Sequence, residues 1–178
     1  MRTNRSAIAS LLALSLAIVP ATVAVAEADG ELTTPSHWTG TETQGPNFAV
    51  PDGDVGFSDS SYRTTIGLTY TAEADDPRAS GDISIVLVYD WSSTVDLGRA
   101  TGLARLVNEG GSFEGPINVV YYDDGSEFRM ALMEGKDGYE GLSYSMTNFL
   151  DASGSGKSQG LIWEGEPPAL PSADQLPA

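Results

Sequence analysis

Residues 112–134 read SFEGPINVVYYDDGSEFRMALME, and they predict two β-strands joined by a tight turn. Residues 112–122 and 126–134 are rich in β-branched, aromatic and other apolar residues, which favour strands. Between them, Asp123-Asp124-Gly125 is a strong hairpin signal. A connection this short joins antiparallel neighbours, so this stretch predicts that consecutive strands pair with each other.

The same pattern continues on both sides of this hairpin. Short β-rich runs alternate with clusters of Gly, Pro, Asp and Ser, and almost nothing after the N-terminal region has helical periodicity. The predicted strands are residues 36–43, 62–73, 82–91, 99–108, 112–122, 126–134, 139–149 and 157–165. Eight antiparallel strands in sequence order close naturally into a barrel, which removes exposed sheet edges. We therefore expect an all-β fold, a single eight-stranded antiparallel up-and-down barrel, with a β-sandwich as the alternative.

The N-terminal region has the pattern of a secretory signal peptide. Arg2 and Arg5 precede the apolar run AIASLLALSLAIV, and Ala24-Val25-Ala26 is a small-x-small cleavage site. We expect cleavage before Glu27 and a secreted, extracytoplasmic protein. The predicted organisation is a signal peptide at 1–26, a flexible leader at 27–35, a barrel domain at 36–165 and a disordered Pro/Ala-rich tail at 166–178.

The charge balance is strongly acidic. Nine Lys and Arg stand against 25 Asp and Glu, a formal net charge of −16 at pH 7. Such a charge repels nucleic acids and anionic lipid surfaces, so we expect neither as a partner once the signal is cleaved. It favours solubility and could attract cations or basic partners. An oligomer remains possible, because Val86 and Val88 give the strand at 82–91 a second apolar face.

Several kinds of chemical site are disfavoured by the residue types present. The chain has no Cys and a single His, His37, so a zinc site of His and Cys ligands is excluded. GSGKS at 154–158 ends like a phosphate-binding loop, but Asp151 replaces the required first Gly and a strand follows. Asp52 with Asp54, and Asp123 with Asp124, lack the full spacing of a calcium loop and fit turns better. We expect no cofactor and no metal.

An aromatic–Glu–Gly triplet occurs three times, at residues 113–115, 139–141 and 163–165. In an up-and-down barrel all three lie at one end, which Trp38 also reaches. We expect a layer of aromatic side chains to plug that end, formed by Trp38, Phe113, Tyr139 and Trp163. The glutamates would then lie at corners, with Glu114 and Glu164 pointing outward, although a pair of the glutamates could act as a glycosidase acid and base. Glu140 points inward unless a bulge at Gly141 changes the alternation of inward and outward side chains along the strand.

The opposite end is the predicted ligand-binding mouth. It carries the longer connections, where small-molecule sites of closed barrels usually lie. Five aromatic residues are the candidate ligand-binding residues: Tyr62, Tyr89, Trp91, Tyr121 and Phe128. They could stack on a flat apolar ligand, or they could complete the core or support an oligomer contact. No residue is predicted to be catalytic.

Four motifs together carry a resemblance to a known group of proteins. DDPRASGD at 75–82, GGSFEGP at 110–116, DGYEGLSY at 137–144 and GLIWEGEPP at 160–168 resemble, as an ordered set, a family of small secreted bacterial β-barrel proteins. The Gly-rich aromatic corner at 135–141 is also similar to that of allene oxide cyclase and dirigent-like barrels of the calycin-like class. This resemblance implies a barrel and supplies no catalytic residues.

Three function classes follow from the sequence. The first is a barrel that binds a small apolar or aromatic molecule in its mouth. The second is a surface or assembly protein without a ligand. The third is a cyclase-like enzyme that shapes a reactive intermediate, although nothing in the residues themselves indicates catalysis.

Overall fold

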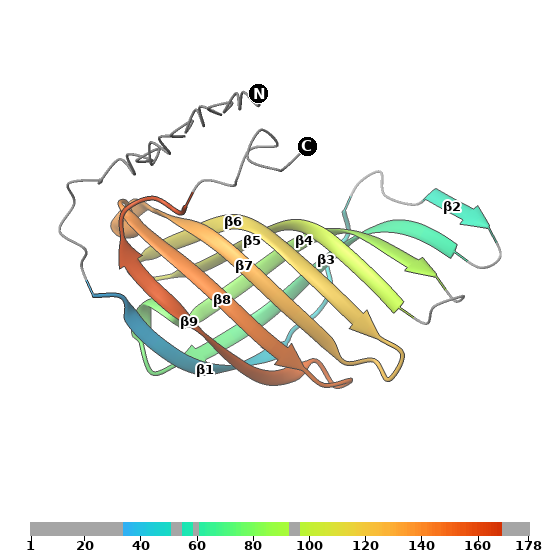
Figure 1. Cartoon of the computed structure of the whole chain (residues 1–178), viewed down its shortest axis with the longest axis horizontal. Helices are drawn as coiled ribbons and strands as arrows, with labels where there is room; N and C mark the ends of the chain where they lie inside the picture. Colours follow the sequence, from blue (N-terminus) through green and yellow to red (C-terminus); the bar gives the residue numbers. More distant parts are fainter. Residues whose placement is uncertain (1–33, 51–54, 59–60, 93–96, 169–178) are drawn as a thin grey trace, which may run out of the picture. The chain divides into compact units, whose positions relative to one another are not determined.

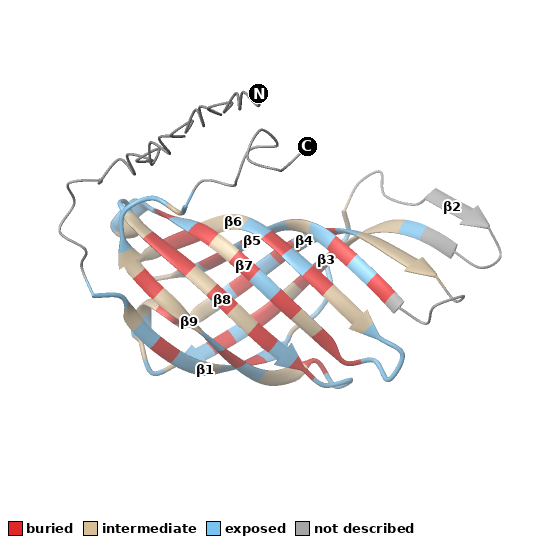
Figure 2. Cartoon of the chain, viewed as in Figure 1, coloured by how far each residue is buried: buried red, intermediate tan, exposed pale blue. Residues whose placement is uncertain are grey.

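Alternating burial characterises several strands of the described part of the protein. In the computed structural model, Ile83, Ile85 and Leu87 are at most 3% exposed, whereas Val86 and Val88 between and after them are about two-fifths exposed. Figure 2 shows this alternation of buried and exposed residues along neighbouring strands. The period of two places one side chain in the barrel interior and the next outside.

The structure describes residues 34–50, 55–58, 61–92 and 97–168. The predicted signal peptide, its cleavage site, most of the leader and the end of the tail lie outside these residues, as do Asp52 and Asp54. The strands are β1 (Ser36–Gln44), β2 (Val55–Ser58), β3 (Ser61–Ala74), β4 (Gly81–Ser92), β5 (Leu97–Asn108), β6 (Gly111–Tyr122), β7 (Glu127–Lys136), β8 (Leu142–Leu150) and β9 (Ser155–Glu164). Two 3-10 turns, η1 (Pro77–Ala79) and η2 (Asp137–Tyr139), lie between β3 and β4 and between β7 and β8.

Eight of these strands form a closed antiparallel barrel (Figure 1). Each pairs with its neighbour in sequence from β3 to β9, and β1 closes the barrel by pairing with both β9 and β3. The predicted up-and-down barrel is therefore confirmed. The additional strand β2 pairs only with β3, and it was not predicted because residues 45–60 carry no clear strand pattern.

The register of the barrel is offset where it closes. One row of paired residues can be followed around the barrel from β3 to β1. It runs through Tyr62, Trp91, Gly98, Tyr121, Glu127, Leu150, Gly156 and Glu42, each paired with the next. Glu42 then pairs with Ala72 of β3, so the row returns to β3 ten residues beyond Tyr62. This offset requires strongly tilted strands. It also places Glu42 of β1 beside the C-terminal end of β3.

One end of the barrel is closed by stacked aromatic rings. Trp38 stacks on Tyr144 with ring centroids 5.3 Å apart, and Tyr144 stacks on Phe113 at 5.0 Å. Phe113 in turn stacks on Tyr139 at 4.9 Å. The predicted aromatic layer is therefore present, with Tyr144 as a member that the triplets did not indicate.

Trp163 does not belong to this layer, and its predicted place in it was wrong. Its neighbour Ile162 is 1% exposed and pairs with the buried Tyr144, so Ile162 is the residue that faces the interior. Trp163 pairs with Ser143 on the other face of the strands and is half-buried there.

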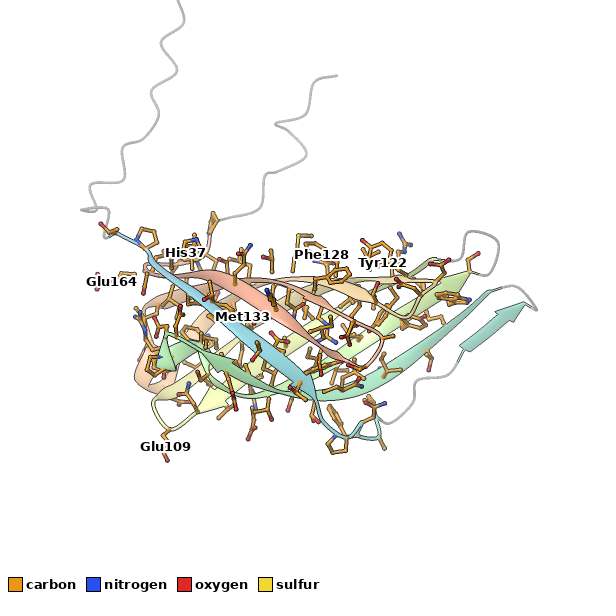
Figure 3. The ribbon with its side chains drawn as sticks, turned by 90° about the horizontal axis from the view of Figure 1, so that it is seen from below. His37, Glu109, Tyr122, Phe128, Met133 and Glu164 are labelled. Atoms are coloured by element: carbon orange, nitrogen blue, oxygen red, sulfur yellow. The ribbon has the colours of Figure 1, made fainter. Side chains whose placement is uncertain are left out.

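The three triplet glutamates lie outside the barrel. Glu140 and Glu164 are exposed, and Glu114 forms an ion pair with Arg105 at 2.5 Å. Gly141 has a φ of +83°, a left-handed conformation that lets Tyr139 reach inward while Glu140 remains exposed. Figure 3 shows Glu109 and Glu164 at this closed end, far from Tyr122. No two of the triplet glutamates Glu114, Glu140 and Glu164 line the same one of the pockets formed by the described residues.

Candidate functional site

Three of the five predicted mouth residues face the barrel interior at the end opposite the aromatic layer. Tyr89 and Tyr121 pack against the core, with ring centroids 4.9 Å apart in an edge-to-face arrangement. Trp91 stacks on Tyr89 at 6.5 Å. Gly98 of β5 makes room for these rings, because a Cβ there would lie 2.7 Å from the Tyr89 hydroxyl and 2.9 Å from Trp91 Cε3.

Phe128 lies on the outside of the barrel, so its predicted place in the mouth was wrong. It pairs with Phe149, which is 53% exposed, whereas its neighbours Glu127 and Arg129 are buried. Figure 3 shows Phe128 near Tyr122, toward the mouth end. Tyr62 pairs with Trp91 in the register of β3 and β4, but its side chain lies outside the described residues.

Beneath the mouth lies a buried cluster of charged residues. Arg129 is 0% exposed, Glu42 1% and Glu127 5%. The guanidinium of Arg129 forms an ion pair with Glu127, and its Nη1 lies 3.8 Å from Glu42 Oε2. These three residues are called the charge cluster below. Burying ions is costly unless they are paired, so the cluster is held by these pairs and by its hydrogen bonds.

Two neutral residues complete the hydrogen bonds of the charge cluster. The Tyr70 hydroxyl accepts a hydrogen bond from Arg129 Nη2 and lies 3.4 Å from Glu127 Oε1. The Arg129 guanidinium also sits over the Tyr70 ring, 3.9 Å from its centroid. Asn148 donates from Nδ2 to Glu42 Oε2 at 2.6 Å. The barrel interior near the mouth therefore holds a charged, hydrogen-bonded cluster among apolar core residues.

Several buried polar atoms of this region have no hydrogen-bond partner among the described residues. They are Glu42 Oε1, Glu127 Oε2, Arg129 Nε and Nη1, Asn148 Oδ1 and the Tyr121 hydroxyl. Unpartnered buried polar atoms are rare in native proteins and commonly mark functional sites or sites of bound water.

Burial shifts the pKa values of the cluster. Desolvation raises the pKa of Glu42 from 4.5 to about 7, although Arg129 and the Asn148 hydrogen bond act in the opposite direction. Burial also raises the pKa of Tyr70 to about 12 and raises that of Tyr121. For Arg129, burial lowers the pKa, but the interactions with Glu127, Tyr70 and Glu42 outweigh burial, so the pKa is raised and Arg129 stays a cation.

A cavity of about 150 Å³ connects the charge cluster to the mouth. Its apolar wall is formed by Ile66 and Leu68, and its polar wall by Tyr70, Tyr121 and Glu127. The turns at Gly125 and at residues 151–154 form its rim, together with Gln44. This cavity is the candidate functional site.

A larger hollow of about 640 Å³ lies on the outside of β1, β7, β8 and β9. Phe128 and Phe149 contribute its apolar part, and exposed polar residues such as Thr39, Thr41 and Gln159 surround them. We favour the smaller cavity as the site, because the larger hollow is a solvated groove on the sheet surface and does not contain the charge cluster.

The charge cluster was missed by the sequence analysis, although a signal for it exists. Glu127 and Arg129 share strand parity with the buried Ala131 and Met133. Charged residues at inward positions of an apolar strand face are unusual and indicate a functional or paired role. Glu42 shows the same parity with Trp38 in β1.

Chemistry beyond the cluster is limited in the described part of the chain. No group of three or more His, Asp or Glu that could hold a metal ion occurs there. No helix among those residues has the length and apolar character needed to cross a membrane. Comparisons of the chain with protein-family models, with curated proteins and with solved structures gave no match.

The raised pKa of Glu42 predicts a pH dependence of stability. Between pH 4.5 and pH 7 the folded state keeps a proton that the unfolded chain releases, so the free energy of unfolding should fall as pH rises through this window. A shift from 4.5 to about 7 corresponds to about 3 kcal/mol. Urea unfolding from pH 4.5 to pH 8 should show this loss in the wild type, added to any general charge effect.

The Glu42→Gln variant isolates the contribution of this carboxyl. Between pH 4.5 and pH 8, the free energy of unfolding of this variant should fall by about 3 kcal/mol less than that of the wild type. Glu109→Gln, at an exposed position of the β5–β6 turn, is the matched control. Its free energy of unfolding should depend on pH as that of the wild type does. If the free energy of unfolding of Glu42→Gln fell with pH as steeply as that of the wild type, Glu42 would not be the group that causes the pH dependence.

Proposed function

We propose that the barrel binds a small molecule with an apolar or aromatic body in its mouth. The observation that supports this proposal is the cavity that combines an apolar wall, Ile66 and Leu68, with unpartnered polar atoms of Tyr121 and Glu127. Binding sites for small molecules typically combine apolar walls with a few polar groups that fix orientation. The rings of Tyr89 and Trp91 extend the aromatic surface from Tyr121 toward the outside.

The size of the cavity limits the ligand. A cavity of about 150 Å³ is about the size that holds benzene in an apolar protein core. It is smaller than the roughly 300–1,000 Å³ of sites for drug-sized molecules. The proposed ligand is therefore a single ring or a short aliphatic group, or the end of a larger molecule that extends past Tyr89 and Trp91.

Trp91 provides a fluorescent probe for this proposal. The chain has three tryptophans, and Trp91 alone stacks on the mouth ring Tyr89 among them. In a Trp38→Phe, Trp163→Phe background, Trp91 emission should change and saturate on titration with benzyl alcohol or benzylamine. Circular dichroism first confirms that the background variant is folded.

A matched pair of variants locates the binding. Ile66→Phe adds bulk at the wall of the cavity and should abolish the saturable change. Phe149→Leu, on the outside of β8, should leave it unchanged. Loss of binding in Phe149→Leu and its retention in Ile66→Phe would instead place the ligand on the outer surface and refute the proposal.

Assembly is a second candidate function, favoured by an apolar patch outside the barrel. Leu103 is 67% exposed and pairs with Val86, which is 38% exposed, and Val88 lies beside them. Contiguous exposed apolar residues often mark interaction sites. Sedimentation velocity over a range of concentrations separates this candidate from a monomeric binding protein.

A further inference from the structure

We propose that the ligand of the mouth is a small organic cation, an ammonium group on an apolar or aromatic body, held by Glu127 and Tyr121. This inference rests on the proposed function and specifies its ligand class. It follows from the acceptors inside the cavity, the aromatic faces around it and the charges at its rim.

The first observation is the unpartnered oxygen of Glu127. Arg129 and Tyr70 contact Glu127 Oε1, whereas Oε2 has no hydrogen-bond partner among the described residues. Glu127 is 5% exposed and lines the cavity, so a group bound in the cavity is the candidate partner for this buried oxygen. A carboxylate oxygen accepts hydrogen bonds, and an ammonium group donates up to three.

The second observation is the aromatic wall next to this oxygen. Tyr121 lines the cavity, pairs with Glu127 in the register of β6 and β7, and has a hydroxyl oxygen without a partner. Tyr70, also in the wall, already carries the Arg129 cation over its ring. Aromatic rings beside a carboxylate are the setting in which proteins bind organic ammonium groups.

The third observation is the sign of the charges around the mouth. Of the described residues that line the cavity, Glu127 and Asp151 are acidic and none is Lys or Arg. The described turns at 123–126 and 151–154 extend this asymmetry, since they contain three Asp and no Lys or Arg. An acidic rim on a protein of net charge −16 attracts cations and repels anions.

The charge cluster also leaves room for one more positive charge. At a pH above the Glu42 pKa of about 7, the cluster holds the carboxylates of Glu42 and Glu127 against the single positive charge of Arg129. A bound ammonium would balance the excess, whereas a neutral ligand would leave it and an anion would increase it. An anionic ligand would also have to approach past the acidic rim.

Three ligands of nearly equal size test this inference: benzylamine, benzyl alcohol and phenylacetate, titrated against Trp91 emission at low salt. Benzylamine should bind at least roughly ten-fold more tightly than benzyl alcohol, with phenylacetate the weakest. The benzylamine affinity should fall as sodium chloride is added, because salt screens the rim charges. The benzyl alcohol affinity should change little.

Variants then assign the preference to residues. Glu127→Gln should bring the affinities of benzylamine and benzyl alcohol to within a few-fold of each other, mainly by weakening benzylamine. Tyr121→Phe removes only a hydroxyl and should weaken benzylamine by roughly three-fold or more, which provides a second test if Glu127→Gln does not fold. Glu134→Gln, an exposed position ion-paired with Lys136, is the control and should keep the wild-type preference.

The outcomes separate this inference from the proposed function. Equal binding of benzylamine and benzyl alcohol to the wild type would overturn the cation proposal while leaving a binding mouth intact. No saturable binding of any of the three ligands would overturn both. A preference for benzylamine that survives in both Glu127→Gln and Tyr121→Phe would refute the assignment to these residues.

Discussion

Replacing Arg129 by methionine should lower the free energy of unfolding by about 3–5 kcal/mol, because it leaves two buried carboxyls without their cation. Arg129 is 0% exposed and is the ion-pair partner of both Glu127 and Glu42. Methionine retains much of the volume of the arginine side chain, so the loss reports mainly on charge. Urea unfolding at pH 8 is the appropriate measurement, because Glu42, with a pKa of about 7, is then largely ionised in the wild type.

A triple variant serves as the control for this prediction. Glu42→Gln and Glu127→Gln together with Arg129→Met remove all three charges of the cluster, and the triple variant should regain most of the lost stability. Replacing a complete buried ion group by neutral residues is often close to neutral in free energy. If Arg129→Met alone proved as stable as the wild type, the charge cluster would not be buried and coupled as described.

Replacing Trp38 by alanine should cost about 3–5 kcal/mol, the range found when a large buried aromatic side chain is removed. Trp38 is 1% exposed and stacks on Tyr144, which in turn stacks on Phe113. The truncation leaves a cavity beside the aromatic layer that closes this end of the barrel. Thermal or urea unfolding followed by circular dichroism measures the loss.

Trp163→Ala is the natural comparison, because it removes the same side chain from a half-buried position outside the aromatic layer. Its cost should be clearly smaller than that of Trp38→Ala, since less of the ring is removed from water in the folded state. Equal costs for the two variants would indicate that Trp163 contributes to the core as much as Trp38 does.

The barrel was predictable because its connections are short and its strands carry a regular period. The turn at Asp123-Asp124-Gly125 and the strands around it fix antiparallel neighbours, and β4 to β7 begin and end within two residues of the predicted bounds. Side-chain direction was less certain near strand ends. Phe128 and Trp163 lie on the outer face because their sequence neighbours Arg129 and Ile162 are the inward residues, and an aromatic residue at a strand end does not by itself indicate which face it takes.

The candidate site was only partly predictable, for a physical reason. Tyr89 and Trp91 lie on β4 and Tyr121 on β6, on either side of Gly98 in β5, so their proximity follows from the strand order and the hairpin registers. The charge cluster depends on closure, which brings Glu42 against Arg129 and against Asn148, a residue 106 positions away in sequence. The offset of the closing register decides which residues meet there, and no local pattern specifies it.

Mapping amide chemical shifts by two-dimensional NMR tests the central claim, that a ligand occupies the mouth, most directly. The titration uses the wild-type protein and whichever of benzylamine or benzyl alcohol binds more tightly. The amides that shift should cluster at the cavity, at Leu68, Tyr70, Tyr121, Glu127 and Gly154. Shifts confined to the outer face at Met130, Phe149 and Leu161, or to the closed end at Gly110 and Tyr139, would contradict it.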